Sequence, residues 1–177
     1  LFVFVLTAPF AARAFICRTQ PAAEKKTALP FPWWGYTGLI TGILSWILAW
    51  SRCAWFEPLQ LHTFTPLWIS YIVVVNALTF RRSGRCMLRD RPGYFLMLFA
   101  ASAVFWWFFE YLNRFVQNWY YIAVSSFNPV EYFLFASVSF STVLPAVLGT
   151  QQFLDTFPFF TRAFGSFFAV GISRQKE

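Results

Sequence analysis

One uncharged stretch constrains the fold of this chain more than any other feature. Residues 94–109 read YFLMLFAASAVFWWFF, sixteen residues without a charged side chain. Extending the helix to residue 114 gives about 20 residues, and at about 1.5 Å per residue these cross roughly 30 Å of hydrocarbon. We therefore predict that residues 94–114 form a membrane-spanning helix.

The composition of the whole chain agrees with that prediction. Of the 177 residues 58% are hydrophobic and only 12% charged, whereas soluble domains carry about 25% charged residues. This balance predicts a chain solvated by lipid, with one transmembrane domain over residues 1–177 folded as an all-α polytopic bundle. The formal charge of +7 lies in short loops beside apolar spans, where the positive-inside rule and anionic lipid explain it. We expect membrane lipids and other membrane-protein subunits as partners, and no nucleic acid.

Prolines and aromatic residues mark where further helices begin. Pro30 and Pro32 precede Trp33 and Trp34, an interfacial aromatic anchor followed by a helix start, and Pro66 suits the first turn of a later helix. Residues 52–65 are expected to form a loop. The predicted spans are residues 1–16 in part, 33–51, 66–80, 94–114 and 129–148, about five in all, with 157–172 as an interfacial segment.

The last span has the most complete set of end signals. Asn128 stands at the N-cap, Pro129 at the first helical position and Glu131 at the third, close to a capping box. At the other end Pro145 is expected to loosen the last turn and Gly149 to end the helix. We therefore expect a helix from about residue 129 to residue 148.

The first sixteen residues allow more than one interpretation. They are apolar but carry Pro9 and Arg13, so they form either the tail of a span that begins upstream or a short interfacial helix. The run opens without a Met, which favours a truncated start. A signal peptide is the third interpretation, because AARA resembles a cleavage site, although a basic region before the apolar run is missing.

Basic residues are unequally divided between the loops. If successive loops alternate across the membrane, one side carries eight Lys and Arg residues, five of them between residues 81 and 91, and the other carries Arg52 and Arg114. The positive-inside rule places the first side in the cytoplasm. Residues 81–93 are therefore expected to form a cytoplasmic loop of a protein in the bacterial inner membrane, with 157–172 on the same face.

Six polar or aromatic side chains gather where the 94–114 helix ends: Glu110, Asn113, Arg114, Gln117, Asn118 and Trp119. The first four are spaced i, i+3, i+4 and i+7, which places them on one side of a helix near the expected outer surface. One interpretation is structural: Glu110 pairs with Arg114 and finishes the helix. The other is a ligand-binding pocket in which Glu110 donates a proton or contacts the ligand.

Glu131 is the second catalytic candidate, and its structural alternative is the cap of its own helix. The only histidine, His62, has Glu57 five residues before it, and this pair alone is too small a ligand set for a metal. The three cysteines lie far apart and form no CxxC pair. We therefore expect neither a metal site nor a disulfide framework.

Small and polar residues within the spans are candidates for helix packing. Gly38 and Gly42 have the small-xxx-small spacing that lets a second helix approach closely, and Ser45 belongs to the same run of small residues. Asn76 lies inside the 66–80 span, where an amide normally hydrogen-bonds to a neighbouring helix. A binding role for Asn76 is the alternative.

The region from residue 106 to residue 135 resembles a known enzyme family. Its aromatic and acidic helix end, the pair Asn118 and Trp119, and the following NPVEYFLF are similar to the heterodimeric-type membrane lycopene cyclases of bacteria and fungi. In that family a spanning helix precedes a Pro-x-Glu-Glu-x-x-Phe-Phe pattern, and the resemblance implies acid-catalysed cyclisation of a carotenoid. This chain has Glu131 followed by Tyr132, so by position only Glu131 keeps a catalytic role. The chain is also similar to uncharacterised bacterial polytopic membrane proteins.

Two functions agree with these features. The first is a non-catalytic subunit of a larger membrane complex, which binds partner helices and lipid or carotenoid through its aromatic faces. The second is a membrane enzyme or carrier for an isoprenoid or lipid, with an outer-leaflet pocket around Glu110. The few polar groups favour the first, and a deep apolar cavity lined by Glu110, Asn113 and Trp119 would favour the second.

Overall fold

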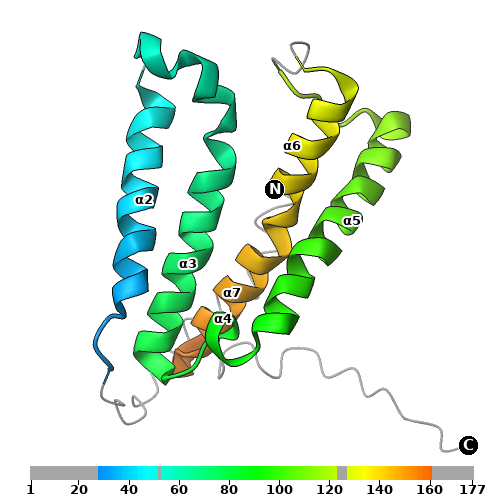
Figure 1. Ribbon diagram of the computed structural model, residues 1–177. Coiled ribbons are helices and arrows are strands. Elements are labelled where there is room, and N and C mark those ends of the chain that lie inside the picture. The colour runs from blue at the N-terminus through cyan, green and yellow to red at the C-terminus, as the bar shows by residue number, and fades with distance from the viewer. Residues whose placement is uncertain (1–27, 52, 123–126, 161–177) are drawn as a thin grey trace, which may run out of the picture. The chain divides into compact units, whose positions relative to one another are not determined.

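The computed structural model describes residues 28–51, 53–122 and 127–160. Within these ranges every regular element is a helix and none is a strand, which confirms the predicted all-α bundle (Figure 1). The expected span at residues 1–16 and most of the interfacial segment 157–172 lie outside the described residues. Residues 28–153 form one compact unit.

Three helical stretches are long and apolar enough to cross a membrane: α3 (Phe64–Ser83), α5 (Pro92–Val116) and the 27-residue stretch Pro129–Asp155. A fourth crossing results if α2 (Trp33–Trp50) and the 3₁₀ helix η1 (Ala54–His62) are counted together as one broken span. The described part of the chain therefore holds three membrane-length helices, or up to four. This is the architecture of an integral membrane protein.

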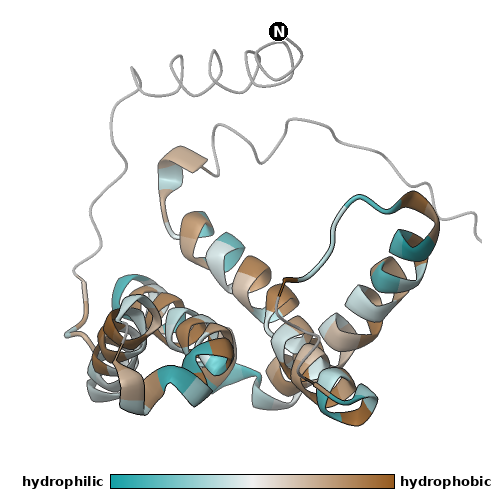
Figure 2. Cartoon of the chain, turned by 90° about the horizontal axis from the view of Figure 1, so that it is seen from above, coloured by the Kyte–Doolittle hydropathy of each residue, from teal (hydrophilic) through white to brown (hydrophobic). Residues whose placement is uncertain are grey.

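The helices of residues 28–153 pack as two pairs. Helix α2 packs along α3, and α5 packs along α6 (Pro129–Ser141), while α3 also meets α6. Figure 2 shows the two pairs side by side, with hydrophobic residues along all of the helices. Large apolar side chains face outward, among them Ile40, Leu96 and Val104, which are 58%, 68% and 72% exposed. Water would penalise such a surface, whereas lipid solvates it.

Glycines bring α2 close to α3. A Cβ atom on Gly38 would lie 2.7 Å from Cγ1 of Val73, and one on Gly42 would lie 3.2 Å from Cβ of Ser70. Both distances are shorter than ordinary van der Waals contact, so the backbones approach to a separation that a larger residue would prevent. Ser45 is half-buried on the same helix.

The expected loop at residues 52–65 is mostly helical. Helix η1 occupies Ala54–His62, and α3 starts at Phe64, two residues before the predicted start. The side-chain nitrogen Nε2 of Gln60 donates hydrogen bonds to the carbonyls of Leu48, Ala49 and Ser51, at 3.3, 2.6 and 3.1 Å. The last carbonyls of a helix need donors from outside it, and η1 folds back to provide one for α2.

The helix of the last span is interrupted at Thr142, although Pro129–Asp155 still forms one membrane-length stretch. Helix α6 ends at Ser141 and α7 (Val143–Asp155) begins two residues later. Pro145 has no N–H to donate to the carbonyl of Ser141, and its ring crowds that carbonyl. The proline therefore breaks the helix one turn before its own position.

The predicted end of this span at residue 148 is also wrong. Helix α7 continues through Gly149 to Asp155. Gly149 is buried, and a Cβ there would lie 3.5 Å from the side-chain nitrogen of Asn76 and 3.8 Å from Val75. This glycine provides contact with α3 inside the helix and is not a terminator.

The boundaries of the two middle spans also differ from those predicted. Helix α3 continues to Ser83, and α5 covers Pro92–Val116 where residues 94–114 were expected. Between them lies a one-turn helix, α4 (Met87–Asp90). Beyond α7 the amide of Phe157 bonds to the carbonyl of Leu154 at 2.9 Å, which turns the chain after Asp155.

Candidate functional site

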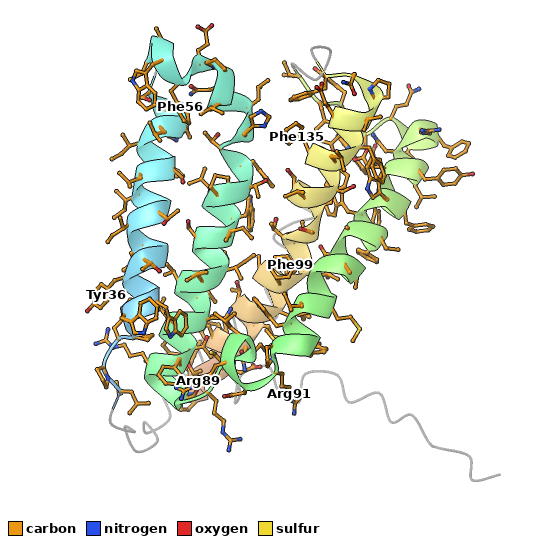
Figure 3. All side chains as sticks on the ribbon, viewed as in Figure 1. Tyr36, Phe56, Arg89, Arg91, Phe99 and Phe135 are labelled. Atoms are coloured by element: carbon orange, nitrogen blue, oxygen red, sulfur yellow. The ribbon has the colours of Figure 1, made fainter. Side chains whose placement is uncertain are left out.

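A cavity of about 430 Å³ lies between the start of α3 and α6. Its volume falls within the range of small-molecule sites, roughly 300–1,000 Å³. Its walls are mostly aromatic and aliphatic, and Figure 3 shows Phe135 on the side of α6 that faces α3. We call this space the aromatic cavity. It is lined by Leu61, His62, Phe64, Thr65, Tyr121, Phe127, Tyr132, Phe135, Ala136, Val138, Ser139 and Phe140.

Two contacts join the walls of the aromatic cavity. The imidazole of His62, at the end of η1, stacks on the ring of Phe135 with centroids 4.3 Å apart and planes at 29°. The hydroxyls of Thr65 on α3 and Ser139 on α6 lie 3.4 Å apart. His62 thus has an aromatic partner, and within the described ranges no three His, Cys, Asp or Glu side chains gather as metal ligands would.

A second and more polar hollow, of about 320 Å³, lies on α5 and α6 around Glu110. We call it the Glu110 hollow, and it is lined by Trp107, Glu110, Tyr111, Asn113, Arg114 and Tyr132. The carboxylate oxygen Oε1 of Glu110 accepts hydrogen bonds from the indole of Trp119, at 2.9 Å, and from the hydroxyl of Tyr121. In the described part of the chain Glu110 and Arg114 do not form the ion pair of the structural interpretation, and Trp119 and Tyr121 are the partners of the carboxylate instead.

The chain turns back after α5, and this turn explains the change of partner. Gln117 has a left-handed backbone (φ 53°), and its N–H bonds to the carbonyl of Asn113 at 2.8 Å. The side chain of Asn113 accepts from the amides of Asn118 and Trp119 at 2.9 and 3.3 Å, and it donates to the Trp119 carbonyl at 2.8 Å. Gln117 therefore leaves the helical face on which it was predicted, and Trp119 reaches Glu110.

Two tyrosines connect the aromatic cavity with the Glu110 hollow. Tyr132 lines both spaces, and Tyr121 lines the aromatic cavity while it donates to Glu110. Burial, and then the hydrogen bond to Glu110, raise the pKa of Tyr121 to about 12. The phenol consequently stays protonated at neutral pH. It continues to donate its hydrogen bond to the Glu110 carboxylate at the wall of the aromatic cavity.

Glu131 lies outside both spaces and caps its own helix. Its Oε2 accepts the amide proton of Asn128 at 3.1 Å, and Oδ1 of Asn128 accepts from the amides of Val130 and Glu131 at 3.0 and 2.9 Å. The predicted capping box is confirmed. The catalytic role that the resemblance implies for Glu131 stays a prediction.

Asn76 is also engaged, although not with another long helix. It is 1% exposed, donates to the carbonyl of Ile72 at 2.9 Å and accepts from the amide of Leu88 in α4 at 3.2 Å. Its amide therefore holds the short helix α4 against α3, at the end of the bundle opposite the aromatic cavity.

The aromatic cavity itself was missed from the sequence. Tyr132, Phe135, Ala136 and Ser139 follow the i, i+3, i+4, i+7 spacing of one helical face, which was the available signal. That spacing does not indicate which helix the face packs against. The proximity of α6 to His62 and Thr65 therefore could not be predicted from it.

No family model, no curated protein and no solved structure matches the chain. Its function is therefore inferred from the two hollows and from the faces of the helices.

Proposed function

We propose that this chain is a non-catalytic subunit of a membrane complex that binds lipid, or another long apolar molecule such as a carotenoid, in the aromatic cavity. The aromatic cavity is the observation that carries the proposal. It is large enough for part of an acyl or prenyl chain, and its apolar walls include Phe64, Phe127 and Phe135. The hydroxyls of Tyr132 and Ser139 offer the few polar contacts that would orient the ligand.

Outward-facing aromatic residues support binding to partner helices. On α2, Trp46 and Trp50 are 59% and 74% exposed, and on α5, Phe108 and Phe115 are 55% and 72% exposed. Such side chains offer large apolar contact areas, and aromatic rings contribute much of the binding energy at protein interfaces.

The location we propose is the bacterial inner membrane, with residues 81–93 in the cytoplasm. Arg89 and Arg91 lie at the end of the helices opposite Phe56 and Phe135 (Figure 3). By the positive-inside rule the arginine end faces the cytoplasm. The aromatic cavity then belongs to the outer leaflet, where a lipid would enter between α3 and α6.

The test is to fill the aromatic cavity. The protein is extracted in mild detergent, and its bound lipids and pigments are identified by mass spectrometry and absorption. We expect Ala136→Trp, which places an indole inside the cavity, to remove most of the ligand from the protein. Leu134→Trp on the exposed face of the same helix is the matched control, because Leu134 is 56% exposed and outside the cavity lining. Equal ligand content in both variants would contradict the proposal.

Glu110 supports a second function, that of an isoprenoid- or lipid-modifying enzyme or carrier. Its carboxylate forms no ion pair with Arg114 in the described part of the chain, and Tyr121 links it to the aromatic cavity. A carboxylate beside an apolar cavity can stabilise positive charge that develops on a substrate. Membranes from cells that accumulate lycopene or other isoprenoids, with and without this chain, would be compared by chromatography. A new product that disappears with Glu110→Gln and persists with Glu131→Gln would favour the enzyme over the subunit.

A further inference from the structure

The end of the bundle away from the aromatic cavity carries a dense group of arginines. Five of them occur between residues 81 and 91, and all five are exposed: Arg81, Arg82, Arg85, Arg89 and Arg91. We call residues 81–91 the arginine segment. It joins α3 to α5 and contains the short helix α4.

The backbone of the arginine segment is fixed to the bundle. Gly84 takes a left-handed backbone (φ 75°), which ends α3 and turns the chain. Cys86 is fully buried. The amides of Met87 and Leu88 donate to the side chains of Gln152 and Asn76, at 3.1 and 3.2 Å. Because these contacts come from α7 and α3, the backbone that carries the arginines is held in place, and ligand binding has mainly the side-chain entropy of the arginines to overcome.

The one acidic residue in the arginine segment has a structural task. Between residues 58 and 109 the chain contains a single acidic residue, Asp90. Its Oδ2 accepts the amide proton of Cys86 at 3.1 Å, which closes the turn of α4. One carboxylate beside five guanidinium groups leaves the segment with a formal charge of +4. A surface with this charge favours an anionic partner.

Aromatic residues place the arginine segment at the depth of lipid head groups. The amide of Leu29, just before α2, bonds to the carbonyl of Arg81 at 2.8 Å, so the start of α2 lies beside the end of α3. Trp33 is 77% exposed there, and Tyr94 at the start of α5 is 45% exposed. Exposed Trp and Tyr mark the membrane interface. Arg89 lies with its guanidinium 5.0 Å from the ring of Phe80, so aromatic and cationic groups share this level.

We propose that the arginine segment is a binding site for the phosphate groups of anionic membrane lipids. Arginine donates two parallel hydrogen bonds to phosphate and keeps its charge at the interface. Lipid is the source of phosphate that these observations favour, because the aromatic belt holds the guanidinium groups beside the bilayer. This site is independent of the aromatic cavity, since it lies at the other end of the helices and requires no ligand there.

The full chain in detergent micelles is titrated with phosphatidylglycerol, or with phosphatidylcholine of the same acyl chains. Native mass spectrometry measures how much of each lipid binds. We expect phosphatidylglycerol to bind roughly tenfold more tightly. Arg85→Gln combined with Arg91→Gln should remove most of this preference. Arg85→Lys combined with Arg91→Lys, which keeps both charges, should retain most of it.

Two further measurements make the result decisive. For the unaltered protein the preference should weaken when ionic strength rises from about 0.1 M to about 1 M, because the Debye length falls from about 10 Å to about 3 Å. This arm holds even if the glutamine variant fails to fold. Equal affinity for the two lipids would overturn the proposal. Loss of the preference in phosphate buffer, but not in chloride of matched ionic strength, would assign the site to free phosphate and would also overturn it.

Discussion

Ser102 on α5 accepts the amide proton of Leu144 at 3.0 Å, inside the break between α6 and α7. The same hydroxyl donates to the carbonyl of Phe140. In an unbroken helix the amide of Leu144 would bond directly to that carbonyl. One side chain from a neighbouring helix therefore completes the hydrogen bonding that Pro145 disrupts, in a membrane segment where water is not available to do so.

Ser102→Ala should destabilise the bundle. Ser102 is 1% exposed, so its loss leaves a buried donor and a buried acceptor without their partner, and we expect a loss of about 1–3 kcal/mol in the free energy of unfolding. Denaturant unfolding in detergent measures it. Ser141→Ala is the control, because that hydroxyl bonds to the Val138 carbonyl of its own helix and should cost less than about 1 kcal/mol. Equal losses would show that the inserted hydroxyl has no special role.

The glycines of α2 predict a graded series. Gly38→Ala places Cβ 2.7 Å from Val73 and should lower the free energy of unfolding by about 1–3 kcal/mol, because the helices must separate. Gly42→Ala, at 3.2 Å from Ser70, should cost less. Gly93→Ala meets no atom within 4 Å and should be neutral or stabilising. Thermal unfolding of the three variants gives the order, and a destabilised Gly93 variant would contradict the steric explanation.

The spans were predictable because their apolar runs are a local property of the sequence. The runs placed both ends of α2, α3 and α5, and the start of α6, within a few residues of where they lie. The break at Thr142 was not predictable in the same way, since the sequence shows Pro145 but not the hydroxyl that Ser102 brings from another helix. Gly149 was misinterpreted for a related reason, because its contact is with Asn76 on α3.

The candidate site shows the limit of helical spacing. Glu110 and Arg114 are four residues apart, which predicts an ion pair on a helix. Trp119 and Tyr121 take the carboxylate because the chain reverses at Gln117. No glycine marks this reversal. The side chain of Asn113 stabilises it. An asparagine three residues before the end of a helix can have several other roles, so it did not predict the reversal.

Gln117→Gly should stabilise the protein. A left-handed backbone costs a residue with a Cβ about 1–2 kcal/mol, part of which is offset by the greater freedom of glycine in the unfolded chain. We expect a net gain of about 0.5–1 kcal/mol in thermal or denaturant unfolding. Asn118→Gly is the control, because among the described non-glycine residues only Gln117 has a positive φ. Glycine at position 118 therefore relieves no backbone strain. A gain in both variants would mean that the backbone angle is not the cause.

Cys53 and Cys86 should differ in reactivity and in sidedness. Cys53 is exposed between α2 and η1, whereas Cys86 is buried at the start of α4, and burial raises the pKa of its thiol. Because the thiolate is the nucleophile, a maleimide should label Cys53 much faster in a Cys17→Ser background. If the arginine end is cytoplasmic, a membrane-impermeant maleimide added outside should still reach Cys53. Protection of Cys53 from the outside would reverse the proposed orientation.

Tyr121 gives a pH test of its link to Glu110. Its pKa is raised to about 12, first by burial and then by its hydrogen bond to the Glu110 carboxylate. The fold therefore favours the neutral phenol, and this contribution to stability is complete below the unfolded pKa of about 10 and is lost as the pH rises through the folded value. The stability difference between the unaltered protein and Tyr121→Phe should accordingly shrink over that window.

Glu110→Gln should lower the pH at which the Tyr121 phenolate absorbs, measured as the difference from the Tyr121→Phe spectrum. An unchanged midpoint in Glu110→Gln would show that the carboxylate does not hold the phenol, and that Tyr121 does not couple Glu110 to the aromatic cavity.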